Sequence, residues 1–178
     1  MKKSIISISI MAAMGLTMLF TACKTVDDGT VQANGTPVEQ TSDTASAEAE
    51  TEASAADITS AVMAEIEIES AVEKTIDDIG AFYDVDTSAI EDMSVFICGS
   101  GAYPDELAAF KFNSYDFAVE GAKAVQKRLD NQLALYTDYT PDEVYKLNDA
   151  VLITRDKWVI FAACSDNSRA KEIIEGLI

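Results

Sequence analysis

Apolar residues recur at helical spacing from residue 58 onward. Ile58, Val62 and Ile66 lie at positions i, i+4 and i+8, which predicts a first helix. The alternation of Glu and Ile over 65–69 also fits an extended chain, so the end of this helix stays open. A second apolar stripe predicts a second helix that ends near residues 80–83. Its members are Val72, Ile76, Ile79 and Phe82.

Two pairs of β-rich runs predict two hairpins. The first pair, 93–98 and 107–112, flanks a loop that starts with Gly99-Ser100-Gly101. The second pair, 150–154 and 157–164, turns around Arg155 and Asp156. The glycine loop lacks the third glycine and the following helix of a phosphate cradle, so it is interpreted as a hairpin loop.

Helices separate and follow these hairpins. A long amphipathic helix is expected over 115–136, and Thr140, Pro141 and Glu143 are typical of a capping box before a short helix through Leu147. The segment 165–168 supplies caps for a last helix. The order αα-ββα-α-ββα predicts an α+β fold, with a four-stranded antiparallel sheet made of two hairpins and helices packed mainly on one face.

Residues 1–22 are typical of a lipoprotein signal peptide. Lys2 and Lys3 precede an apolar stretch, 5–20, that is short for a membrane span. The sequence Leu19-Phe20-Thr21-Ala22-Cys23 resembles the bacterial lipobox, with Phe20 where Leu is usual. This resemblance implies that Cys23 becomes the mature N-terminus and carries diacylglycerol on its sulfur, with acyl chains such as palmitate. These would hold the protein on the extracytoplasmic face of the cell membrane. An ordinary secretory signal with a chance cysteine is the alternative.

Residues 23–57 continue from the lipidated cysteine as an acidic tether. This segment has no aromatic residue and few large apolar ones, so it cannot bury enough surface to offset its ordering entropy. The single folded domain is therefore expected over 58–178.

The charge balance limits the partners. The chain has 31 acidic and 13 basic residues, a formal charge of −18, and phosphate recognition needs a basic face. Nucleic acid is therefore not expected as a partner. The remaining partners are the membrane, through the lipid on Cys23, and an envelope protein or a small ligand.

The folded part resembles a family of small lipoproteins from Clostridia-type Gram-positive bacteria that carry a C-terminal domain of unknown function. The resemblance rests on 105–111, on the helix to Arg128, and on 136–143, where the pattern Tyr-x-x-Tyr-x-Pro-x-Glu is the most specific part. It continues through 148–151 and Asp166. The resemblance supplies no activity, cofactor or catalytic residue.

Few residue patterns indicate catalysis or metal binding. The chain has no His, which excludes Ser-His-Asp and Cys-His catalysis. The EF-hand-like start at Asp84-x-Asp86-x-Ser88 lacks the required Gly and Glu, although Asp84, Asp86, Glu91 and Asp92 leave a looser oxygen-ligand site open. Ser168 and Lys171 match a Ser-x-x-Lys motif in letters only, and Ser168 is interpreted as a helix cap. No cofactor is expected.

Cys98 and Cys164 each end a predicted strand. If these strands are neighbours, the two thiols can form a disulfide outside the cell. Otherwise they are two small buried residues.

Aromatic and acidic residues near the predicted crossover form the candidate binding surface. Aromatic rings beside carboxylates suit a sugar, a peptide or a protein partner, and the same rings could instead pin the crossover to the sheet. The set comprises Tyr136, Asp138, Tyr139, Asp142, Tyr145 and Trp158.

Two functions follow from these observations. The first is a membrane-anchored, non-catalytic binding or interaction module of the cell envelope. The second is a small extracytoplasmic enzyme that uses Asp/Glu carboxylates or a metal held by them, which requires acids that converge in a cleft.

Overall fold

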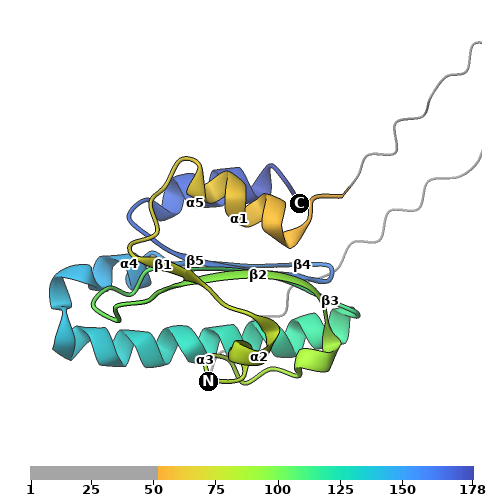
Figure 1. Cartoon of the computed structure of the whole chain (residues 1–178), viewed down its shortest axis with the longest axis horizontal. Coiled ribbons are helices and arrows are strands. Elements are labelled where there is room, and N and C mark those ends of the chain that lie inside the picture. Colours follow the sequence, from red (N-terminus) through yellow and green to blue (C-terminus); the bar gives the residue numbers. More distant parts are fainter. Residues whose placement is uncertain (1–51) are drawn as a thin grey trace, which may run out of the picture. The chain divides into compact units, whose positions relative to one another are not determined.

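The computed structural model describes residues 52–178 (Figure 1). The expected signal peptide, Cys23 and the expected tether up to residue 51 lie outside the described residues. The first helix, α1 (Ala55–Met63), begins before the expected domain start at residue 58. The Ser54 hydroxyl caps it by accepting from the Asp57 N–H at 3.1 Å.

The described residues contain one antiparallel sheet of five strands in the order β1-β2-β3-β5-β4. Both expected hairpins form, β2 with β3 and β4 with β5, and β3 pairs with β5 to join them. The α+β class is confirmed, but the expected number of four strands is wrong. The strands are β1 (Ala71–Glu73), β2 (Ile90–Cys98), β3 (Glu106–Phe112), β4 (Val151–Arg155) and β5 (Trp158–Ala163).

The additional strand comes from the region expected to form the second helix. Val72 does not start a helix; it lies in β1 and pairs with Ile97 of β2. Helix α2 (Ile76–Ile79) is a single turn. The apolar stripe over 72–82, which predicted one helix, is therefore divided between a strand and a one-turn helix. Residues 71–73 form a strand because their backbone groups bond to those of β2.

Helices cover both faces of the sheet, which corrects the expectation of one covered face (Figure 1). Helix α3 (Tyr115–Tyr139) packs on one face, and α1 and α5 (Asn167–Glu175) pack on the other. In β3, Ala108 and Phe110 face α3, whereas Leu107 and Ala109 face α1 and α5. A strand buried on both sides is apolar at nearly every position, which explains the continuous run of β3.

The expected capping box at Thr140 does not form. Pro141 starts a 3-10 helix, η2 (Pro141–Glu143), as expected of a first helical position, but the Thr140 hydroxyl makes no capping hydrogen bond. Glu143 instead pairs with Lys146, at 2.8 Å between Nζ and Oε2. Helix α4 (Val144–Asn148) follows directly.

The cap of the last helix also differs from the expectation at Ser168. Asp166 caps α5, since its carboxylate accepts from the Arg169 N–H at 2.9 Å. Ser168 lies inside the helix.

Candidate functional site

Tyr136, a member of the expected binding surface, lies near the end of α3 and is buried in the core. Its hydroxyl lies 2.8 Å from the carbonyl oxygen of Tyr103 and 3.1 Å from that of Gly101. Both carbonyls belong to the loop between β2 and β3. Tyr136 therefore ties α3 to this loop and has a structural role.

Trp158 lies away from the tyrosines. It pairs with Lys111 at one end of β3, whereas the loop that Tyr136 holds precedes the other end. Trp158 is buried with α1 and α5, and its Nε1 donates to Glu52 Oε1 at 3.1 Å. The structure thus does not bring the six expected residues together.

The exposed members of the set lie around the end of α3 and in α4. Tyr139 is 68% exposed and Tyr145 is 48% exposed, and Asp138 and Asp142 are also on the surface. Tyr145 borders a surface cavity of about 500 Å³. The other lining residues are Asp149, Ser165, Asp166, Asn167 and Ser168. Three of the four exposed residues, Asp138, Tyr139 and Asp142, are not among the residues that line it.

The floor of this cavity is fixed by Asn167, which is 7% exposed. Its Nδ2 donates to the Lys146 carbonyl oxygen at 2.8 Å, and its Oδ1 accepts from the Cys164 N–H at 3.0 Å. One side chain therefore joins the start of α5 to α4 and to the end of β5. Leu147 of the same short helix is buried in the core, so α4 is held in place and the Tyr145 side chain extends from a fixed backbone.

Lys146 anchors α4 through two carboxylates. Its Nζ lies 2.7 Å from Asp105 Oδ2 and 2.8 Å from Glu143 Oε2, and both Lys146 and Asp105 are buried. Burial acts to lower the pKa of Lys146, but the hydrogen bonds and charges of the two carboxylates outweigh it and raise that pKa. The cation is therefore held in its charged form at neutral pH.

Glu106 is fully buried on the α3 side of β3 and is surrounded by donors. The Arg128 guanidinium donates to it from Nη2 at 2.7 Å, Gln132 Nε2 donates at 2.8 Å, and the Tyr83 hydroxyl also donates to it. Burial, followed by the charge of Glu106, raises the pKa of Tyr83 well above its ordinary value. Burial acts to lower the pKa of Arg128, and its hydrogen bonds to Glu106 outweigh this and raise it.

The sequence reasoning did not identify Asp105, Glu106, Arg128 and Lys146 as an interacting group. The available signal was an acidic pair placed directly before an apolar strand, since a buried carboxylate needs a cation or several donors. The partners come from α3 and α4, far along the chain. Local patterns could not pair them.

The acidic segment around Asp86 is structural. The Asp86 carboxylate accepts from the Ser88 N–H at 3.0 Å and caps a 3-10 helix, η1 (Thr87–Ala89). Asp92 accepts from the Ala55 N–H at 2.7 Å. Among residues 52–178 no three His, Cys, Asp or Glu side chains are grouped so as to hold a metal ion.

Cys98 and Cys164 are free and buried. They lie at the ends of β2 and β5, and β3 lies between these strands, so the condition for the expected disulfide is not met. Burial raises the pKa of Cys164 to about 11. For Cys98, burial acts in the same direction, but the Ser100 hydroxyl and loop N–H groups outweigh it and lower the pKa of the thiol.

Comparison with known proteins gives a family but no function. No helix in the described part of the chain has the length and apolar character needed to cross a membrane. No curated protein and no solved structure matches the chain. A family profile described as "Domain of unknown function (DUF4358)" matches residues 64–164, which is more than half of the chain. The protein therefore belongs to the DUF4358 family.

Proposed function

We propose that this protein is a lipid-anchored lipoprotein of a Clostridia-type Gram-positive bacterium, and that its domain is a non-catalytic binding module on the extracytoplasmic face of the cell membrane. The anchoring part rests on the lipobox-like sequence that ends at Cys23. The binding part rests on the structure of residues 52–178.

The observation that carries the binding function is the half-exposed Tyr145 ring beside a polar cavity with a fixed floor. Tyr145 offers an apolar face and a hydroxyl, and Asp149, Ser165 and Ser168 add hydrogen-bonding groups. The floor is held by Asn167, so a ligand would meet a surface that is already organised, which lowers the ordering cost of binding.

The two buried acids have structural partners rather than the arrangement that acid-base catalysis requires. The enzyme hypothesis requires carboxylates that converge in a cleft. Asp105 and Glu106 are instead consecutive, each is paired with its own cation, and neither lines the cavity at Tyr145. Their contacts link β3 to α3 and α4.

Lipidation is tested by growing the bacterium with an alkyne analogue of palmitate and separating membrane from soluble proteins. The wild-type chain should carry the label and sediment with the membranes. The Cys23→Ala chain should carry no label and leave the membrane fraction. Equal labelling or equal sedimentation of the two chains would contradict the anchoring proposal.

Binding is tested by thermal unfolding of the full-length chain in detergent micelles, followed through the single tryptophan, Trp158. The panel contains short peptides, mono- and oligosaccharides, cell-wall fragments, Ca²⁺, Mg²⁺ and Zn²⁺. A ligand at 100 times its Kd should stabilise the fold by about 2.7 kcal/mol.

The matched variants are Tyr145→Ala and Tyr115→Ala. Tyr115 is 62% exposed and starts α3, at the opposite end of that helix from α4. Tyr145→Ala should remove the stabilisation by the ligand, and Tyr115→Ala should keep it. A panel without any shift, or a shift that survives Tyr145→Ala, would contradict a binding site at this cavity.

A further inference from the structure

The two edges of the sheet differ in how far they are open to another strand. Edge strands are usually protected by shortness, by charge or by proline. Strand β1 has three residues and ends in Glu73. Strand β4 has five residues, contains no proline, and carries no charge before Arg155. The β4 edge is therefore less protected than the β1 edge against pairing with an added strand.

The backbone groups that face this open edge belong to Leu152 and Thr154. The Phe112 N–H donates to the Lys157 carbonyl at 2.9 Å. The backbone N–H and C=O groups of Lys157 and of the odd-numbered residues of β5 therefore point toward β3. Trp158 and Ile160 must then face β4, where they pair with Arg155 and Ile153. Since the direction alternates along a strand, the N–H and C=O groups of Leu152 and Thr154 face away from β5. Within the range 52–178, no backbone group outside the sheet is hydrogen-bonded to them.

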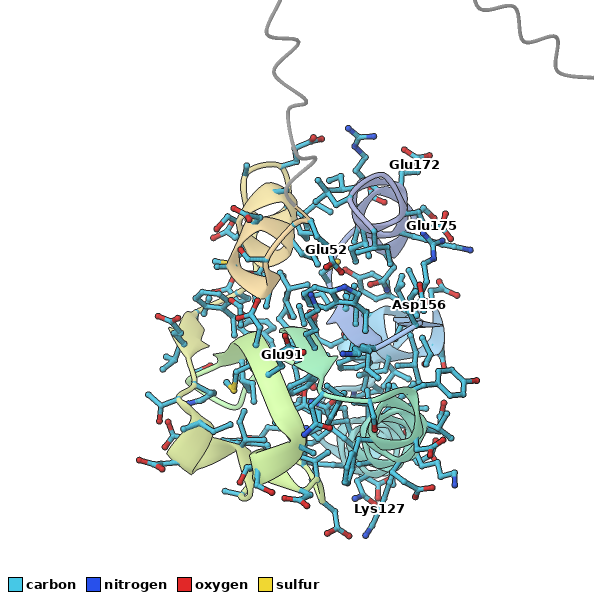
Figure 2. All side chains as sticks on the ribbon, turned by 90° about the vertical axis from the view of Figure 1, so that its right-hand side faces the viewer. Glu52, Glu91, Lys127, Asp156, Glu172 and Glu175 are labelled. Atoms are coloured by element: carbon cyan, nitrogen blue, oxygen red, sulfur yellow. The ribbon has the colours of Figure 1, made fainter. Side chains whose placement is uncertain are left out.

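A groove runs beside this edge. It has a volume of about 390 Å³ and lies between residues 150–153 and the side chains of α5, among them Lys171 and Glu175. Figure 2 shows α5, with Glu172 and Glu175 labelled, above the hairpin that carries Asp156. Asp149, Asn167 and Ser168 line both this groove and the cavity at Tyr145, so the two hollows are neighbours.

We propose that an extended peptide segment of a partner protein binds here by adding a strand to β4, with its side chains in the groove under α5 and toward Tyr145. A strand edge next to a helix offers what such a peptide needs. The edge supplies main-chain hydrogen bonds, and the groove receives alternate side chains. This inference rests on the proposed binding function and names the surface and the class of partner.

Charge indicates what this peptide carries. Among the lining residues, Lys171 Nζ lies 3.8 Å from Glu175 Oε1, and the Asp149 carboxylate has no salt bridge within residues 52–178, in a chain whose formal charge is −18. A peptide with Lys or Arg residues is complementary to this surface, whereas a second copy of the acidic chain is repelled. The occupant is therefore a basic extended peptide.

The probe is a phage-displayed library of random linear peptides of about eight residues, somewhat longer than a typical strand. It is selected on the biotinylated full-length chain in detergent micelles. Enriched peptides should alternate apolar and polar residues and contain Lys or Arg. They are then synthesised, and their affinities are measured by fluorescence polarisation.

The decisive variant is Thr154→Pro. It removes an N–H that faces outward, and it removes no hydrogen bond between β4 and β5. Its matched control is Thr154→Val, which keeps the N–H and the β-branched shape. Thr154→Pro should weaken peptide binding by about tenfold or more, and Thr154→Val should leave it nearly unchanged. Glu175→Gln should weaken binding of Lys/Arg peptides by about two- to fivefold.

Hydrogen exchange reports the binding mode directly. The Leu152 and Thr154 amides should exchange rapidly in the free chain and at least about tenfold more slowly with bound peptide. A selection that enriches no peptide would overturn the inference that the partner is a peptide. The proposed binding function would still hold if another ligand of the thermal-unfolding panel bound at the Tyr145 cavity. Peptide binding that is unchanged in Thr154→Pro would overturn the β4 site alone. Self-association that is lost in Thr154→Pro would overturn the partner peptide in favour of a second copy.

Discussion

Arg128 and Glu106 form a two-nitrogen ion pair between α3 and β3. Arg128 Nη2 and Nε lie 2.7 Å and 3.1 Å from Glu106 Oε2. The Glu106 side chain is fully buried, whereas the Arg128 side chain is 21% exposed. The pair fixes the start of the central strand against the middle of the longest helix, and Gln132 adds a third donor from the next turn of α3.

Arg128→Met should destabilise the fold strongly. Methionine keeps much of the side-chain volume but leaves the Glu106 charge buried without its cation, which typically costs about 3–5 kcal/mol. The measurement is the free energy of unfolding in urea, followed by Trp158 fluorescence. A second variant separates the charge from the packing: Arg128→Met combined with Glu106→Gln removes both charges and should lose less than Arg128→Met alone. A double variant that is at least as unstable would contradict a penalty from the unpaired charge.

Gly121→Ala should also destabilise the domain, for a steric reason. A Cβ at residue 121 would lie only 2.4 Å from the Phe112 ring, which is 1% exposed, so the ring or the helix would have to shift. Overpacking of this kind costs about 1–3 kcal/mol. Gly80→Ala is the matched control, because a Cβ there meets nothing within 4 Å and its φ of −60° suits any residue. Thermal unfolding should show a lower Tm for Gly121→Ala only, and equal Tm values would contradict the close packing of α3 on β3.

The thiol chemistry gives a separate test of strand order. Because β3 separates the strands that carry Cys98 and Cys164, both thiols should stay reduced in the folded chain. After denaturation without reductant, a maleimide label should therefore modify both residues, as read by peptide mass spectrometry. A disulfide-linked peptide pair from 98 and 164 would contradict the strand order of the sheet.

The parts of the fold that could be predicted from the sequence are those set by local patterns. The two hairpins and α3 appear where short β-rich runs and a long apolar stripe predicted them. Strand β1 was missed because Val72 shares a helical spacing with Ile76 and Ile79, and only its pairing with Ile97 makes it a strand. The continuous apolar runs of β3 and β5 were the available signal for a second covered face, but they do not show which helices cover it.

The candidate site was predictable only in part. Tyr145 was identified as a candidate surface aromatic, but its neighbours Ser165, which precedes α5, and Asn167, which begins it, are brought there by the tertiary fold. Tyr136 and Trp158 were grouped with it on composition, although their hydroxyl and indole N–H are used for structural hydrogen bonds. An aromatic residue in a sequence does not show whether its polar atom faces a ligand or the protein interior.

Cys164 should make the fold sensitive to alkaline pH. Burial raises the pKa of its thiol from an ordinary value of 9.0 to about 11, so the folded chain holds this proton more tightly than the unfolded chain. The resulting stability is complete below about pH 9 and is lost as the pH rises toward 11, up to about 3 kcal/mol for two pKa units. The raised pKa values of Tyr83 and Lys146 act with the same sign at higher pH.

Urea unfolding with reductant should therefore show a free energy of unfolding that declines from pH 9 to 11, and this decline should be shallower in Cys164→Ala. Cys98→Ala should keep the full decline, because the pKa of Cys98 is lowered rather than raised. Equal slopes in the wild type and in Cys164→Ala would contradict a buried, protonated Cys164 at the end of β5.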